Sequence, residues 1–244
     1  MGRLRKSVRF LRAAALGLFI LFLFAIACIQ VEQHVLRRQA ERLLADVRFL
    51  EIHSATLRDV QDLKRKWKAL AHFDGNCMEA ECTLEISWKD LYFRHIGFFF
   101  KTRALHAFLL AGGRPELIVA RVKVERGLVS GKGFHVVLVA PAFQAPEIDY
   151  GLLADAYSVS EFSKSYRPPP VHPDYIVGKP GGCDGPCREV HFVFSPSANS
   201  ATISRLMEFD LSCLTRWIHP CRTEGDIMPS AWAQYEMDYP SAVN

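Results

Sequence analysis

The sequence predicts an α+β fold: an N-terminal transmembrane helix, two amphipathic helices, and then a mostly antiparallel β-sheet domain with disulfides. Three observations predict it. Residues 13–31 form a predominantly apolar run without charge. Residues 32–72 repeat apolar side chains at helical spacing. Beyond residue 72, apolar and polar residues alternate in several short segments, which is typical of strands with one buried face.

The apolar run is long enough to cross a bilayer. At about 1.5 Å per residue, a helix over 13–31 reaches roughly 28 Å, close to the ~30 Å hydrocarbon core. Residues 1–12 before it hold five Lys or Arg residues, and such charge stays on the cytoplasmic side. We therefore predict a cytoplasmic basic tail, a single-pass anchor in the cell membrane and an extracytoplasmic remainder, either periplasmic or exterior.

Two other interpretations of this run stay open. Ala25-Ile26-Ala27 matches a signal-peptide cleavage site, and Cys28 after it loosely matches the lipid-carrying cysteine of a bacterial lipoprotein signal. The helical periodicity that continues directly after the run, and the length of the run itself, favour an uncleaved anchor. All three interpretations place the bulk of the chain in the same compartment.

The segment 32–72 is predicted to be helical and close to the membrane. A break at Ile52 to Ala55 divides it, and Thr56 with Asp59 forms a capping-box pattern at the start of the second helix. Asp74-Gly75 is a turn signal that we expect to end this helix. The first helix carries one apolar stripe, formed by Leu36, Ala40, Leu43, Leu44, Val47 and Leu50.

Residues 73–244 are predicted to form the extracytoplasmic α+β domain. Alternation predicts strands around residues 84–88, 118–125, 134–139 and 189–194, with 129–133 as a hairpin connection. A short helix is expected over 200–209 and a last strand over 211–214. The Pro/Gly-rich stretch 141–187 is predicted to be one long loop.

Cysteine usage fits an oxidising compartment. One of the seven cysteines, Cys28, lies in the apolar run. The other six cysteines are an even number, and in a compartment outside the cytoplasm this predicts disulfides. Proximity favours three local pairs, although the sequence alone permits 15 pairings. The candidates are Cys77 with Cys82, Cys183 with Cys187, and Cys213 with Cys221.

The charge distribution favours a membrane over a nucleic acid. Residues 1–70 hold 14 Lys/Arg against 6 Asp/Glu, and this excess near the anchor suits anionic lipid head groups. A nucleic-acid binder would concentrate basic residues on the folded domain. We find no catalytic motif and predict no metal or cofactor site. Three tyrosines in the loop-rich part, Tyr157, Tyr166 and Tyr175, are candidates for a binding surface.

Both ends of the chain carry a family resemblance. The stretch 209–215 (FDLSCLT), Cys221-Arg222 and 228–232 (MPSAW), together with 40–47 (AERLLADV) after the anchor, resemble uncharacterised bacterial single-pass membrane-anchored proteins with a cysteine-containing extracytoplasmic domain. The family has no known activity, so the resemblance implies a bacterial envelope setting and paired cysteines rather than a reaction.

The expected function is therefore a non-catalytic binding or scaffolding domain of the cell envelope, anchored in the membrane by residues 13–31 and with a protein partner in the envelope. The sequence identifies no small-molecule ligand. One alternative is an envelope enzyme, either a thiol oxidoreductase using Cys183 and Cys187 or a hydrolase. Another is an accessory subunit of a membrane complex, in which the apolar span itself binds the partner.

Overall fold

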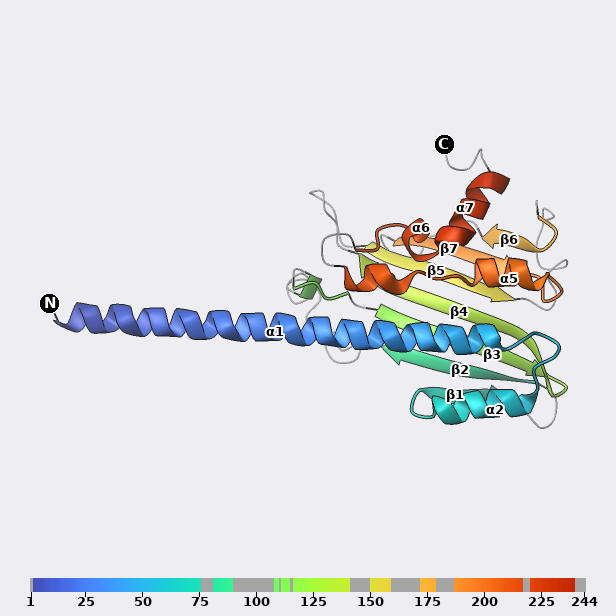
Figure 1. Ribbon diagram of the computed structural model, residues 1–244, viewed down its shortest axis with the longest axis horizontal. Coiled ribbons are helices and arrows are strands. Elements are labelled where there is room, and N and C mark those ends of the chain that lie inside the picture. Colours follow the sequence, from blue (N-terminus) through green and yellow to red (C-terminus); the bar gives the residue numbers. More distant parts are fainter. Residues whose placement is uncertain are drawn as a thin grey trace.

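The computed structural model describes residues 2–75, 81–89, 108–109, 111–114, 116–140, 150–158, 172–178, 187–216 and 220–239. A single long helix, α1 (Gly2–Phe49), projects from a domain built on one β-sheet (Figure 1). By length and composition α1 meets the criterion for a membrane span, which N-terminal signal sequences also meet.

The sheet has seven strands in the order β1-β2-β3-β4-β5-β7-β6. Neighbouring strands are antiparallel except for β5 and β7, which are parallel. The predicted α+β class with a mostly antiparallel sheet is thus confirmed. The strands are β1 (Ala71–Gly75), β2 (Glu81–Lys89), β3 (Glu116–Glu125), β4 (Leu128–Ala140), β5 (Tyr150–Ser158), β6 (Tyr175–Gly178) and β7 (Cys187–Phe194).

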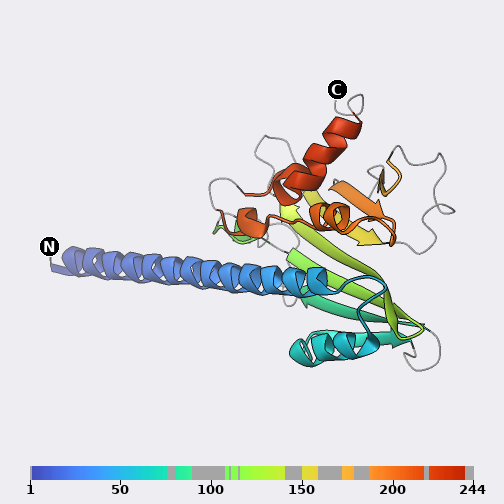
Figure 2. The same ribbon diagram turned by 45° about the vertical axis from the view of Figure 1, so that its right-hand side comes forward.

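Helices cover one face of this sheet. Figures 1 and 2 show α1 lying along the sheet with α2 on one side and α5 on the other. A 3-10 helix, η2, also packs against α1, and α7 packs on α5 and α6. These elements are α2 (Leu57–Lys66), α5 (Ser200–Leu206), η2 (Leu211–Thr215), α6 (Glu224–Ile227) and α7 (Pro229–Asp238).

The two parts of α1 differ in their surroundings. Large apolar side chains of its first part are exposed, including Leu18, Leu21 and Phe24. Its last part supplies the stripe expected from the sequence, and Leu36, Leu43 and Val47 are buried in the core. One continuous helix therefore carries both an apolar exposed surface and a core-forming surface.

The core lies between the helices and one face of the sheet. Alternate residues of the central strands point into it, and their neighbours in sequence point to the opposite face. The buried strand residues that share the helix-covered face include Leu84, Ile86, Ala120, Val122, Phe134, Val136, Ala154, Ala156, Val190 and Phe192.

Local signals placed some boundaries correctly. The capping box of α2 is present: the Thr56 backbone N–H donates to the Asp59 carboxylate at 2.8 Å. The Thr56 hydroxyl donates to the same carboxylate, also at 2.8 Å. The helix ends at Lys66, however, earlier than expected. Residues 71–75, which were predicted to form the end of this helix, instead form β1 and pair with β2.

Three further expectations need correction. The stretch 141–187, predicted as one loop, contains β5 and β6, and β7 begins at its last residue. The predicted last strand over 211–214 is η2, with the Asp210 side chain accepting a hydrogen bond from the Ser212 amide at its start. The β3–β4 turn lies at Arg126-Gly127, both with positive φ, whereas the predicted connection 129–133 belongs to β4.

Candidate functional site: a polar row across the open face of the sheet

Polar side chains line up on the face of the sheet opposite the helices. Strand register brings them together: His72 pairs with Glu85, Glu85 with Arg121, His135 with Asp155, and Asp155 with His191. Each is flanked in sequence by residues of the core face, so the alternation of the strands directs it outward. We call this set the polar row; it consists of His72, Glu85, Arg121, His135, Asp155 and His191.

Asp155 is the centre of the polar row. Its side chain is almost completely removed from solvent, at 4% exposure for the residue. The Nδ1 atoms of His135 and His191 donate to its two carboxylate oxygens, at 2.5 Å and 2.6 Å respectively. A buried carboxylate is costly unless it is hydrogen-bonded and paired. The two imidazoles meet this need from the strands on either side, β4 and β7.

The second nitrogen of each imidazole also faces a charged group. Nε2 of His135 lies 3.5 Å from Nη1 of Arg121, and a guanidinium at that position favours the tautomer with its proton on Nδ1. Nε2 of His191 lies 3.4 Å from Oε1 of Glu189. His191 thus has a carboxylate at each nitrogen, which favours the doubly protonated imidazolium.

The ionisation of the central pair follows from these contacts. Burial opposes ionisation of Asp155, but hydrogen bonds and charge from His135 and His191 outweigh it and hold the pKa of the carboxyl below its ordinary value. The Asp155 hydrogen bond raises the pKa of His191, with burial opposing and the charges of Asp155 and Glu189 assisting. Both shifts favour the charged pair.

The row continues towards the first strand of the sheet. Arg121 Nε donates to Oε2 of Glu85 at 2.8 Å, and Nε2 of His72 lies 4.0 Å from the other oxygen of Glu85. The Arg121 side chain stays about half exposed. The outer end of the row is therefore open to solvent, whereas its centre at Asp155 is closed.

The ring nitrogens of His135 and His191 all face charged neighbours. A general base or a metal ligand needs an imidazole nitrogen that is free to accept. Here His135 and His191 each have both nitrogens directed at charged neighbours. Among the residues that the structure describes, no three His, Cys, Asp or Glu side chains are placed to hold a metal ion. What the row offers is a fixed pattern of charges and donors.

A second feature lies on the helix-covered side, where α1 ends. A groove of about 1260 Å³ is lined by the last turn of α1, by α2 and by α5. Lys132 on β4 is buried in its wall, and its ammonium donates to the carbonyls of Arg48 and Leu50 at 2.9 and 2.7 Å. These are orphan carbonyls of the helix end, where a cation is favourable. Burial, with a smaller effect of Arg48, lowers the pKa of Lys132 to about 8.

The predicted cysteine pairs are placed only in part. Cys213 and Cys221 form a disulfide and are both buried. Cys82 is also disulfide-bonded, but its predicted partner Cys77 lies outside the described residues. Cys187 is the first residue of β7, but its predicted partner Cys183 also lies outside the described residues. The 77–82 and 183–187 pairs remain predictions.

The three tyrosines proposed for a binding surface do not come together in the described part of the chain. Tyr157 lies on β5, where its ring stacks on His135 with centroids 6.0 Å apart. Tyr175 is buried at 1% exposure, and its hydroxyl donates to the Asp238 carboxylate. The core therefore takes the ring of Tyr175 away from any open surface. Tyr166 lies outside the described residues.

Comparison with family models, curated proteins and solved structures finds no match to this chain. The site is therefore defined by its own geometry. The sequence alone does not single out the polar row. The available signal was a lone polar residue on the outward side of several strands, such as Arg121 in 118–125 and His191 in 189–194.

Proposed function

We propose that this protein is a membrane-anchored, non-catalytic domain of the cell envelope that presents the polar row to a binding partner outside the cytoplasm. The observation that carries the proposal is the dual character of α1. Its apolar part is exposed at Leu18, Leu21 and Phe24, while Leu43 and Val47 further along are buried in the domain. A membrane is the environment that would cover the first set.

The compartment is inferred from two independent features. Basic residues precede the apolar run, which favours a cytoplasmic N-terminus. The Cys213–Cys221 disulfide supports an oxidising space for the folded domain, because disulfides are rare in the cytosol. The non-catalytic part of the proposal is argued from the ring nitrogens of His135 and His191, which all face charged neighbours.

Anchoring is tested by placing charge in the apolar part of α1. The double variant Leu21→Lys and Phe24→Lys changes two exposed side chains, so the domain is expected to stay folded. Each lysine near the centre of a span costs about 2.5–3.5 kcal/mol. The full-length variant should leave the membrane fraction on alkaline washing, whereas Met237→Lys, an exposed change on α7, should remain. Equal retention of both variants would contradict the proposal.

Recognition through the polar row is tested by photo-crosslinking in cells. A photoreactive residue at Arg121, on the open face, should give a discrete crosslinked species. The same residue at Arg58, which is exposed on α2, serves as the control on the helix-covered side. If the two positions give identical products, the polar row is not the recognition surface. A reporter enzyme that is active only outside the cytoplasm, fused to the C-terminus, tests on which side of the membrane the folded domain lies.

A further inference from the structure

Contacts between α1 and the rest of the domain begin at the point along the helix where the apolar run ends. The Gln30 side-chain amide donates to the Ala111 carbonyl at 3.4 Å. Gln33 pairs with the backbone of Arg114 in both directions, accepting from its N–H and donating to its carbonyl, each at 3.2 Å. Because residues 13–31 form the apolar run, these contacts lie at its end, and α1 continues through them as one helix.

A distant part of the chain reaches a similar level. Arg37 Nη1 donates to the Thr215 hydroxyl of η2 at 3.0 Å. Arg37 lies six residues beyond Val31, which corresponds to about 9 Å along the helix axis. Since the head-group layer occupies roughly 5–8 Å on each side of the hydrocarbon core, η2 lies at its outer edge. Because packed helix axes lie about 8–10 Å apart, a tilt of about 20° would shift η2, which contacts α1, by about 3 Å along the bilayer normal.

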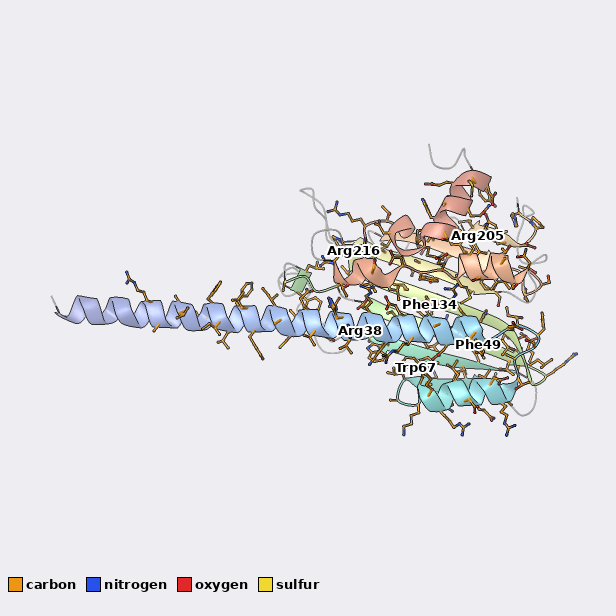
Figure 3. All side chains as sticks on the ribbon, viewed as in Figure 1. Arg38, Phe49, Trp67, Phe134, Arg205 and Arg216 are labelled. Carbon is orange, nitrogen blue, oxygen red and sulfur yellow. A yellow bond between two sulfur atoms is a disulfide. The ribbon has the colours of Figure 1, made fainter. Side chains whose placement is uncertain are left out.

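Two arginines stand at this end of the domain. Figure 3 labels Arg38 and Arg216 at the end from which α1 projects. Arg38 is exposed. The Arg216 side chain is 54% exposed, lies 3.8 Å from Asp210, and donates to the hydroxyl of Ser212. Their guanidinium groups match phosphate oxygens in charge and geometry.

We infer that this end of the domain rests directly on the bilayer, with Arg38 and Arg216 binding the head groups of anionic phospholipids. The inference rests on the proposed anchoring of α1 and adds a second, peripheral contact to it. The unbroken course of α1 between the apolar run and the core keeps this end of the domain near the head groups, and the two arginines hold it against them. The polar row is then held at a defined height and orientation rather than on a flexible stalk.

The test measures the distance of two labels from the membrane surface. Full-length protein carries a single fluorophore, coupled to a genetically encoded azide residue placed either at Ser212 on η2 or at Phe49 at the far end of α1, so that its cysteines are left unchanged. Phe49 is 87% exposed and lies 18 residues beyond Val31, about 27 Å along the axis. The vesicles contain phosphatidylcholine and phosphatidylglycerol, with a fraction of lipids that carry a nitroxide on the head group.

The Ser212 label should be quenched several-fold more strongly than the Phe49 label. The double variant Arg38→Glu and Arg216→Glu should lose much of that excess, and Arg38→Gln with Arg216→Gln part of it. The control double variant Arg58→Glu and Arg126→Glu, with the same change in charge, should keep it. In vesicles of phosphatidylcholine alone, protein with both arginines intact should show a smaller excess of quenching at Ser212 over Phe49.

The outcomes separate this inference from the anchoring on which it rests. Equal quenching at Ser212 and Phe49 in vesicle-bound protein overturns the inference and leaves the anchoring intact. Quenching that depends neither on phosphatidylglycerol nor on Arg38 and Arg216 overturns the head-group contact. Protein that does not associate with vesicles overturns both proposals.

Discussion

Replacing Asp155 with asparagine removes the charge at the centre of the polar row with little change in shape. The carboxylate now accepts one N–H from each imidazole, and an asparagine has only one acceptor oxygen for the two donors. One charge-assisted hydrogen bond, worth about 1.5–3 kcal/mol, is lost, and the half-buried His191 loses its main counter-charge. Breaking a buried ion pair typically costs 3–5 kcal/mol, so we expect Asp155→Asn to destabilise the protein by about 3 kcal/mol.

The assay is thermal unfolding of the full-length protein in detergent, followed by near-ultraviolet circular dichroism. For a chain of this size, about 3 kcal/mol corresponds to a fall in Tm of roughly 6–12 °C. Glu81→Gln is the matched control, because Glu81 lies on the same sheet in an exposed ion pair with Lys123 at 3.2 Å. Exposed pairs contribute at most about 1 kcal/mol. If Asp155→Asn lowers Tm no more than Glu81→Gln, the assigned role of Asp155 is wrong.

The pH dependence gives a second check on Asp155. Its pKa is held below the ordinary value of 3.8, so its contribution is present above that pH and is lost as the pH falls through the lowered pKa. The pKa of His191 is raised above 6.5, so its contribution is complete below 6.5 and is lost as the pH rises through the raised pKa. The stability difference between wild type and Asp155→Asn should therefore be largest between about pH 4 and 6.5. A difference that grows above this window contradicts the charged pair.

Three other predictions concern the framework. The pKa of Lys132 falls from 10.5 to about 8 on folding. As the pH rises from 8 to 10.5, the free energy of unfolding of the wild type should therefore rise by about 3 kcal/mol relative to that of Lys132→Met, as measured by denaturant unfolding. Tyr175→Phe removes a hydrogen bond to Asp238 and should lower the free energy of unfolding by about 1–2 kcal/mol in the same assay. Burial, and then Asp238, raise the pKa of the Tyr175 phenol, so in the wild type this phenol should resist alkaline titration followed by absorbance. The double variant Cys213→Ser and Cys221→Ser opens a short loop, with a separation of 8 residues, and should lower the free energy of unfolding by about 2–3 kcal/mol; an unchanged Tm under reductant would contradict this.

The elements that the sequence predicted well are those whose pattern is local. The stripe in 36–50 repeats at the helical period, and Leu36, Leu43 and Val47 are indeed buried. Strand alternation similarly predicted which residues of 118–125 face the core, where Ile118 and Val122 are buried. Period alone decides which side of an isolated element is apolar, so tertiary context is not needed.

The β3–β4 turn shows where a local signal misleads. Gly131 and Gly133 suggested a connection, but both lie within β4. They stand at points where the neighbouring strand leaves no room for a side chain. A Cβ at Gly133 would lie 2.7 Å from the Tyr157 Cβ, and one at Gly131 would lie 2.8 Å from the Ser158 hydroxyl. These glycines therefore permit close approach of β4 and β5. The turn uses Arg126-Gly127, where positive φ is required at both positions.

The polar row was beyond the reach of the sequence because its members meet only through register. His191 reaches Asp155 through the parallel pairing of β5 with β7, and β6 lies between these two strands in the chain but not in the sheet. Within its own strand, each residue looks like an ordinary outward-facing polar side chain. Strand order and parallel pairing are long-range properties, which alternation does not encode.

The same register links the polar row to the anchor. On β4, Lys132 points to the helix-covered side and binds the carbonyls at the end of α1, while His135 points to the other side and binds Asp155. A slip of one residue would exchange the faces, placing an imidazole in the core and removing the ammonium from the end of α1. Each misplaced polar group would cost several kcal/mol, so both contacts favour one register. Strand β4 thus fixes the orientation of the open face relative to α1, and through α1 relative to the membrane that we propose it spans.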